Sequence, residues 1–234
     1  MFQIESSPLG RVVVAARDAL FYTTIDFPGR LDDQVAASIT SFIQARFGLA
    51  VSLTTCVQVH GVVARAAGRE ARWRECDSCD ALWSAERGVA LGIKVADCLP
   101  LSIAGDGVIA NIHSGWRGAV QKITSATLDT LPFDPRTARA YLGPSIRACC
   151  FEVGEEVVDQ FADAFPQFDA YVDRSRTRPH IDVARLTAGT LRRRGFADAN
   201  IFDSGLCTRC EGSIFHSYRR DGGRGGRNLA IVAQ

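Results

Sequence analysis

This 234-residue sequence lacks the features that mark membrane-spanning and nucleic-acid-binding proteins. It has no run near the roughly 20 apolar residues that a membrane-spanning helix needs, no internal repeat and no low-complexity linker. Its formal net charge is only +1, so it has no overall field that would attract nucleic acid or an anionic membrane. With 47% hydrophobic and 23% charged residues, its composition is that of an ordinary globular protein.

The sequence also begins without the long apolar centre of a signal peptide. Residues 1–16 hold one short apolar run, which lies between Arg11 and Arg17. We therefore expect a cytoplasmic protein, in which the eight cysteines are free thiols or metal ligands rather than disulfides. The adjacent Cys149 and Cys150 would form a strained bridge with each other.

Hydrophobic periodicity predicts a single α/β domain over residues 1–234, because strands and helices alternate irregularly. Patterns with helical spacing predict helices at residues 31–47, 119–131, 151–165 and 180–194. Alternating or short apolar runs predict strands at residues 51–63, 88–103 (interrupted by Pro100), 107–112, 200–202, 214–218 and 228–232.

Only four histidines are present, and two of them stand with a cysteine at the ends of predicted strands. They are His60 before a glycine, Cys98 before Leu-Pro, and His113 at the start of His-Ser-Gly-Trp-Arg-Gly. Separations of 38 and 15 residues exclude a local zinc finger, so the fold would have to assemble a site. Catalytic zinc typically has three protein ligands and one open position, whereas structural zinc usually has four. The alternative is that each histidine is an ordinary surface or core residue.

Two Cys-x-x-Cys pairs, at residues 76/79 and 207/210, have the spacing of zinc knuckles. Because 127 residues separate them, further than zinc ribbons usually allow, unpaired loop thiols are favoured over one shared site. A thioredoxin-like redox role is disfavoured, since neither pair opens a helix after a strand.

Arginines beside glycine-rich turns are candidate anion ligands. Arg117 lies in the turn after His113, while Arg219 and Arg220 precede the Gly/Arg run at residues 222–227. Forked guanidinium groups and backbone amides hold phosphate or carboxylate well. A solvated loop between strands is the alternative, and one short Arg/Gly run in a neutral chain does not favour RNA binding.

Seven motifs in the same order make the sequence resemble the YfiH/YlmD family, whose members are also called laccase-domain or polyphenol-oxidase-like proteins and purine nucleoside phosphorylases. The resemblance runs from about residue 55 to the C-terminus, roughly three quarters of the chain. The motifs are Gln-Val-His-Gly (58–61), Ala-Asp-Cys-Leu-Pro (96–100), His-Ser-Gly-Trp-Arg-Gly (113–118), Gly-Pro-Ser-Ile (143–146), Phe-Glu-Val-Gly (151–154), Cys-Thr (207–208) and Ser-Tyr-Arg-Arg-Asp (217–221).

The resemblance implies one α/β domain of mixed β-sheets flanked by helices, similar to the cytotoxic necrotizing factor catalytic fold. It also implies a zinc ion held by His60, Cys98 and His113. The implied activities are phosphorolysis of adenosine, inosine, guanosine and methylthioadenosine, and deamination of adenosine. Copper-dependent phenol oxidation and hydrolytic editing of a peptidoglycan precursor are alternatives. The implied partners are the nucleoside and phosphate, and we expect a monomer or small homo-oligomer that binds neither nucleic acid nor membrane.

Residue roles follow from the implied reactions. In deamination, the metal would lower the pKa of its bound water and direct the hydroxide at C6 of the purine. Asp97 is expected to orient a histidine or move a proton, with a hydrogen-bonding strand-end aspartate as the alternative. In phosphorolysis, Arg117, Arg219 and Arg220 would place phosphate against C1′ of the ribose, and Gln58 is a further expected substrate contact.

One segment departs from the family pattern. Relatives carry Arg-x-Gly-Gly-Val-Ser leading to Ser-Leu-Asn near the pocket, whereas residues 21–30 read Phe-Tyr-Thr-Thr-Ile-Asp-Phe-Pro-Gly-Arg. The substrate is therefore less firmly predicted than the metal site. His216 stands where many relatives have Phe, so it is not predicted to be a ligand.

Three other classes of protein stay open. The first is a non-catalytic module whose zinc is structural and completed by Cys56 or Cys149. The second is a cysteine hydrolase with Cys98 as nucleophile and His113 as base. The third is a copper oxidase, although four histidines are too few for the His-rich clusters of a multicopper enzyme.

Overall fold

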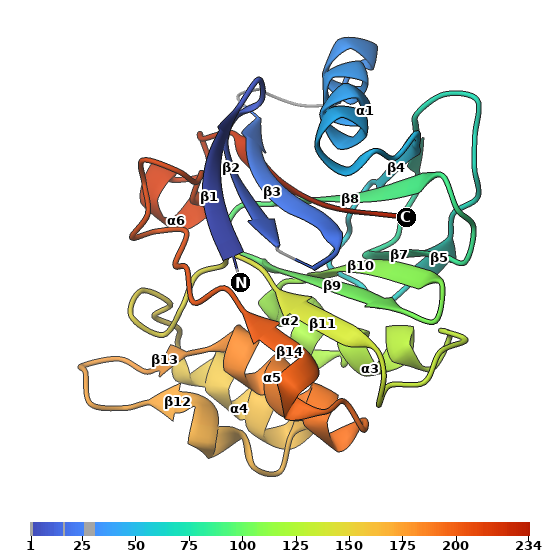
Figure 1. Cartoon of the computed structure of the whole chain (residues 1–234). Coiled ribbons are helices and arrows are strands. Elements are labelled where there is room, and N and C mark those ends of the chain that lie inside the picture. Colours follow the sequence, from blue (N-terminus) through green and yellow to red (C-terminus); the bar gives the residue numbers. More distant parts are fainter. Residues whose placement is uncertain (1, 16, 26–30) are drawn as a thin grey trace.

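Two β-sheets stack face to face, and helices cover the outer side of each (Figure 1). The computed structural model describes residues 2–15, 17–25 and 31–234. Each sheet contains both antiparallel and parallel strand pairs. The predicted α/β fold with mixed sheets is therefore confirmed.

The strands have the following order and bounds. The seven-stranded sheet runs β1 (Phe2–Ser7), β2 (Gly10–Ala15), β3 (Ala19–Ile25), β15 (Arg227–Ala233), β8 (Val89–Val95), β4 (Ser52–Cys56) and β6 (Arg74–Cys76). The six-stranded sheet runs β14 (Ile201–Asp203), β11 (Arg139–Leu142), β9 (Leu99–Gly105), β10 (Val108–Ser114), β7 (Ala81–Ser84) and β5 (Ala64–Ala66). A separate ribbon pairs β12 (Val172–Asp173) with β13 (His180–Ile181).

The helices lie outside these sheets or in the loops between strands (Figure 1). They are α1 (Asp33–Phe47), α2 (Trp116–Val120), α3 (Ile123–Leu128), α4 (Glu155–Ala164), α5 (Val183–Arg193) and α6 (Tyr218–Asp221), with 3₁₀ turns η1 (Phe168–Tyr171) and η2 (Asp198–Asn200). None of the helices within the described residues is both long and apolar enough to cross a membrane.

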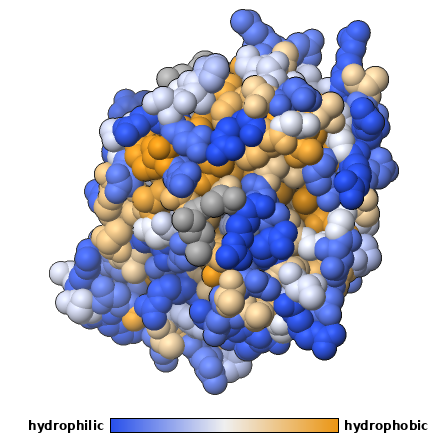
Figure 2. Space-filling model, in the orientation of Figure 1, coloured by the Kyte–Doolittle hydropathy of each residue, from blue (hydrophilic) through white to orange (hydrophobic). Residues whose placement is uncertain are grey.

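Side-chain alternation along the strands builds three apolar layers. In β2, Val13 packs between the two sheets, while Val12 and Val14 face α1. In β10, Ile109 lies between the sheets, while Ile112 faces the layer formed by α2 to α5. On the outer surface shown in Figure 2, hydrophilic residues interrupt the apolar patches. Most of the apolar residues that alternate along the strands therefore lie in the layers between the sheets or between a sheet and its helices.

The predicted helix at residues 31–47 is confirmed as α1. Asp32 caps its first turn by accepting a hydrogen bond from the amide of Val35 at 2.8 Å. Gly48 ends it in the left-handed conformation, with φ of 71°. The helices α4 and α5 likewise lie within predicted helical segments.

Two predicted elements are each divided by a residue with a left-handed backbone. The predicted strand at 88–103 is β8 and β9, separated around Asp97 (φ 83°), where the chain passes from one sheet to the other. The predicted helix at 119–131 is divided at Lys122 (φ 65°) into α2 and α3. Side chains with a Cβ rarely adopt this conformation, so hydrophobic periodicity does not reveal either break.

Two strand predictions need correction. The predicted strand at 51–63 ends at Cys56, and a loop follows. The predicted strand at 214–218 is wrong, because the Ser217 hydroxyl accepts a hydrogen bond from the amide of Arg220 and begins α6.

The N-terminal strands β1 to β3 have no counterpart in the sequence prediction. β3 pairs with β15 in the seven-stranded sheet. It contains residues 21–25 of the segment that departs from the family pattern, and residues 26–30 lie outside the described residues.

One buried side chain links the two sheets. Asn111 in β10 is fully buried, and its amide donates to the carbonyls of Leu91 (3.0 Å) and Ala230 (2.9 Å), both in the seven-stranded sheet. Its own oxygen accepts a hydrogen bond from the Ser102 hydroxyl at 3.1 Å. Asn111 therefore sets the register of one sheet upon the other.

We predict that Asn111→Ala lowers the free energy of unfolding by about 1–3 kcal/mol, the cost of leaving buried polar groups without their partner. Urea denaturation followed by fluorescence measures the change. Ser102→Ala is the matched control and should cost less, since both bonds between the sheets remain. An Asn111→Ala protein as stable as the native chain would contradict this role.

Candidate metal and active site

The end of β10, the turn before β9 and the loop before β5 meet at one point. His60 comes from the loop, Cys98 from the turn and His113 from β10. Their potential ligand atoms all lie within 4.8 Å of one another. The fold therefore gathers the three residues that the sequence predicts to share a site.

Strand register explains the meeting. β9 and β10 are antiparallel, with Pro100 opposite His113, so Cys98 lies beyond the end of β9 and next to Gly115. Pro100 thus lies inside a strand instead of interrupting one, and its carbonyl accepts the amide of Gly143 at 2.9 Å.

Asp80 holds His113 in place. It is fully buried and directly precedes β7, which pairs with β10. Because Ala81 lies opposite Ile112 in this antiparallel pair, Asp80 lies beside His113. Its Oδ1 lies 2.8 Å from His113 Nδ1, and its carbonyl accepts the His113 amide at 2.7 Å. With Nδ1 engaged in this way, Nε2 is the ring nitrogen left for a metal or for Cys98.

The same carboxylate shapes the loop that carries His60. It accepts hydrogen bonds from the amides of Val59 (3.3 Å), His60 (2.9 Å) and Gly61 (2.7 Å). His60 has φ of 60°, a conformation that costs about 1–3 kcal/mol for a residue with a side chain. The three hydrogen bonds to Asp80 offset that cost and place His60 facing His113.

The site polarises its own thiol. Burial acts to raise the pKa of Cys98, but hydrogen bonds and positive charge from His113 and His60 lower it to about 6. Burial acts to lower the pKa of His113, but Asp80 and Cys98 raise it to about 9. The residues alone therefore favour a thiolate beside an imidazolium, and a cation bound to both would displace the imidazolium proton.

The donor set and the space at this point fit a metal ion. The His60 and His113 rings have centroids 4.8 Å apart at an interplanar angle of 75°. A Cβ added at Gly115 would lie 2.9 Å from Cys98 Sγ and 3.1 Å from His60 Cδ2, so only glycine leaves room there. Two imidazoles and one thiolate are ligands that zinc and copper accept.

The group has three members within the described part of the chain. Neither Cys56 nor Cys149, the candidate fourth ligands of a structural zinc, belongs to it. Three protein ligands favour an open metal site over a closed structural one.

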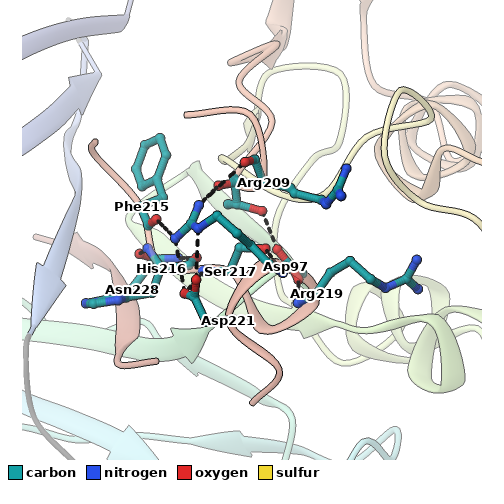
Figure 3. Close-up of polar contacts among 10 residues, drawn as sticks. Asp97, Arg209, Phe215, His216, Ser217, Arg219, Asp221 and Asn228 are labelled. Carbon is teal, nitrogen blue, oxygen red and sulfur yellow. Dashed lines mark hydrogen bonds and ion pairs between the residues drawn. The ribbon is translucent and has the colours of Figure 1, made fainter. Parts of the chain in front are cut away.

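Asp97, predicted to be catalytic, lies beside Cys98 but serves the turn. Its carboxylate accepts hydrogen bonds from the Thr208 hydroxyl (2.6 Å) and from the Arg219 amide (2.7 Å), and Figure 3 shows it next to the Arg219 backbone. Asp80, and not Asp97, is the carboxylate that orients a histidine. These contacts favour the hydrogen-bonding alternative, and proton transfer by Asp97 stays a prediction.

Gln58 and Arg117 are both predicted to contact substrate, but within the described residues only the Gln58 side chain is already hydrogen-bonded to the protein. Both ends of the Gln58 amide bond the main chain of Lys94, at 2.7 and 2.9 Å, which favours a structural role. Arg117 is exposed, and its guanidinium lies over the Trp116 ring, 4.4 Å from the centroid. Of the two, Arg117 is the side chain with donors to offer a ligand.

The two arginines of the 217–221 motif are held by the protein itself. The Arg220 guanidinium pairs with Asp221 and donates to the carbonyls of Thr208 (3.1 Å) and Phe215 (2.8 Å). Arg219 donates to the carbonyl of Glu152 at 3.0 and 3.1 Å, and Figure 3 shows its side chain directed away from Asp97. These contacts favour structural roles for both residues over the predicted phosphate contact.

Asp80 is the residue of the candidate site that the sequence does not reveal. It ends the polar stretch at residues 65–80, where several other acidic side chains lie. The one available signal is its place directly before the apolar strand β7.

Solved structures with the same fold are similar to this chain. YlmD from Geobacillus stearothermophilus superimposes with a TM-score of 0.82 at 23% identity, covering 100% of this chain and 98% of that one. The Bacillus licheniformis hypothetical protein YfiH gives 0.79 at 22% identity, covering 95% and 93%. At these identities the likeness establishes the fold.

Curated relatives are similar in sequence. A protein named purine nucleoside phosphorylase from Deinococcus radiodurans is 34% identical over 218 residues, which cover 90% of this chain and 82% of the relative. A protein named adenosine deaminase RL5, from an unknown prokaryotic organism, is 35% identical over 163 residues. That match covers 67% of this chain and 62% of the relative's length.

The family itself is defined by a model described as multi-copper polyphenol oxidoreductase laccase, which matches residues 29–234. These residues include all seven ordered motifs and the three gathered candidate ligands. Together with the YfiH and YlmD folds, the match confirms the resemblance seen in the sequence. The chain therefore belongs to the multi-copper polyphenol oxidoreductase laccase family, the family of YfiH and YlmD.

Proposed function

We propose that this chain is a zinc-dependent purine nucleoside enzyme. It would cleave adenosine, inosine, guanosine and methylthioadenosine with phosphate, and deaminate adenosine. The observation that carries the proposal is the convergence of His60, Cys98 and His113, with His113 held by the buried Asp80. The relatives named purine nucleoside phosphorylase and adenosine deaminase support the choice of substrate class.

Some residues of the site would bind the metal ion, and others would orient those ligands. His60, Cys98 and His113 would hold a zinc ion, which would supply Lewis acidity toward the substrate. Cys98 serves as a thiolate, Asp80 keeps the His113 ring in one orientation, and Gly115 leaves the space beside them open. Asp97, next to Cys98, would hold the turn that carries this thiolate, and proton transfer by Asp97 stays a prediction from the sequence.

Arg117 is the proposed phosphate ligand. In phosphorolysis, a phosphate oxygen forms a bond to C1′ of the ribose as the bond from C1′ to the purine nitrogen breaks. This displacement depends on where the anion is held. Arg117 follows the Gly115–Trp116 turn and, among the described residues, its guanidinium has a ring contact but no hydrogen bond or ion pair. Arg219 and Arg220 would stabilise the neighbouring loops through their hydrogen bonds to main-chain carbonyls.

Copper-dependent phenol oxidation is the second candidate, because the family is described as a multi-copper polyphenol oxidoreductase. Two groups of potential metal ligands occur among the described residues, and only one of them contains histidine. Multicopper chemistry needs several histidine-rich clusters. The site therefore supports the nucleoside function better.

We predict that Cys98→Ser lowers the zinc content by one equivalent per chain and abolishes nucleoside turnover, because a serine hydroxyl does not ionise to replace the thiolate. Elemental analysis and chromatography of adenosine and inosine, with and without phosphate, measure both effects. Cys76→Ser, at a cysteine outside both metal-ligand groups, should change neither. Full turnover by a Cys98→Ser protein that has lost this zinc would contradict the proposed mechanism.

We predict that Asp80→Asn weakens zinc binding about 10–100-fold, the usual effect of losing a carboxylate behind a histidine ligand. Competition with a chromophoric chelator gives the affinity. The matched control is Asp77→Asn, three residues earlier and exposed, which should bind zinc as the native protein does. Equal zinc affinity in the Asp80 and Asp77 variants would show that Asp80 does not orient the ligand.

We predict that Arg117→Ala raises the KM for phosphate about tenfold or more, since a charge-assisted hydrogen bond contributes about 1.5–3 kcal/mol. Adenosine deamination, which uses no phosphate, should change little. Initial rates of both reactions in the same preparation give the comparison, with Arg11→Ala on the exposed part of β2 as control. If both reactions fall equally, Arg117 supports the site as a whole and is not the phosphate ligand.

A further inference from the structure

Four cysteines form a second group of potential metal ligands, which shares no member with the first. Cys149 and Cys150 lie between β11 and α4, and Cys207 and Cys210 lie after β14. Their sulfur atoms all lie within 4.8 Å of one another. The sequence favours free loop thiols at 207 and 210, but the structure places them against the adjacent pair at 149 and 150.

The Cys76–Cys79 pair belongs elsewhere. Cys76 pairs with Cys56 across β6 and β4, and the thiol of Cys79 hydrogen-bonds with that of Cys56. A zinc site made of the two Cys-x-x-Cys pairs is therefore wrong. The partner of the second pair is the two adjacent cysteines, a combination that no spacing rule suggests.

Two of the distances between the sulfur atoms are close to those of a tetrahedral metal site. Cys210 Sγ lies 3.4 Å from Cys150 Sγ and 3.8 Å from Cys149 Sγ. Four thiolates at the usual Zn–S length of about 2.3 Å have sulfur–sulfur edges of about 3.8 Å. A disulfide requires about 2.05 Å, so the cysteines are thiols, each near two or more others.

The loop around Cys207 is already arranged for a thiolate. The backbone amides of Arg147, Cys210 and Arg209 donate hydrogen bonds to the sulfur of Cys207. Amides of the second and third residues after the first cysteine thus stabilise the charge of its sulfur, as a metal-binding Cys-x-x-Cys turn requires.

Positive side chains surround the group as well. Arg209 donates to Cys150 Sγ at 3.5 Å, and Arg176 donates to the carbonyl of Cys149 at 3.1 Å. Four thiolates and one divalent cation carry a net charge of −2, which such arginines compensate. Without a cation, four thiolates this close would repel one another, and only part of them could ionise.

We propose that Cys149, Cys150, Cys207 and Cys210 bind one zinc ion in a closed, structural site. Four sulfur ligands leave no position for a substrate, so the site stabilises and does not catalyse. On binding, each thiol releases its proton to solvent as its sulfur–zinc bond forms. Cys149 and Cys210 are exposed, which gives the ion access from solvent.

The ion would join two segments that hold the catalytic turn. The backbone of Cys207 forms an isolated parallel β-bridge with Ser145. The hydroxyl of the next residue, Thr208, donates a hydrogen bond to the carboxylate of Asp97. The carbonyl of Thr208 also accepts the Arg220 guanidinium. Zinc at the four cysteines would therefore fix the segments that support Asp97, next to the ligand Cys98.

The test counts zinc in a background that lacks the first site. Cys98→Ser protein should retain one zinc per chain, and the Cys98→Ser, Cys149→Ser, Cys210→Ser protein should retain none, as measured by elemental analysis after gel filtration. The Cys98→Ser, Cys76→Ser protein is the matched control and should retain one. Retention of no zinc by Cys98→Ser protein, or of iron in its place, would overturn the proposal.

Spectra and thiol counts test the site by readouts other than activity. Cobalt(II) added to metal-free Cys98→Ser protein should give the visible bands of a tetrahedral thiolate site, and Cys149→Ser alone should shift them. Native protein purified without reductant should show all thiols once zinc is chelated under denaturing conditions. A Cys150–Cys210 disulfide in that sample would instead show that the group is a redox pair. The nucleoside activity is tested separately, so failure of one proposal leaves the other standing.

Discussion

The candidate site depends on one buried carboxylate. Asp80 accepts three amides of the loop that carries His60 and also contacts Nδ1 of His113. A buried charge is tolerated only when hydrogen bonds satisfy it, so the loop and the histidine are as necessary to Asp80 as it is to them. This mutual dependence couples the backbone of one ligand to the ring of another. Asp80 therefore joins two candidate ligands into one unit through the protein's own hydrogen bonds.

The third candidate ligand, Cys98, is placed by the order of the strands in the two sheets. Between β8 and β9 the chain leaves the seven-stranded sheet and enters the six-stranded one, and the turn that makes this step contains Asp97 and Cys98. A crossing between stacked sheets must reverse sharply, and Asp97 does so with φ of 83°. Cys98 follows the reversal directly, at the end of β9 nearest to His113. A cysteine in a long strand, as periodicity predicts for residues 88–103, would not have this position.

Sequence patterns predicted part of the fold and singled out the three residues that meet at the candidate site, but not the contacts that support them. α1 is bounded by Asp32 and Gly48, whose capping chemistry is local and therefore readable. The breaks at Asp97 and Lys122 depend on tertiary contacts, and β1 to β3 lie before the region of family resemblance. The sequence does not reveal the roles of Asp80 and the four gathered cysteines for the same reason. The contacts that define them join residues far apart in the chain.

The later family motifs acquire a physical role from these contacts. The first three motifs contain the candidate ligands, whereas those near residues 146, 152, 208 and 219 surround the turn before Cys98. The Ile146 amide donates to the carbonyl of Asp97, and Thr208 and the Arg219 amide donate to its carboxylate. Arg219 in turn bonds the carbonyl of Glu152. A left-handed aspartate costs about 1–2 kcal/mol and would relax unless held from several sides. We therefore interpret the second half of the chain as the scaffold that keeps Cys98 in reach of the two histidines.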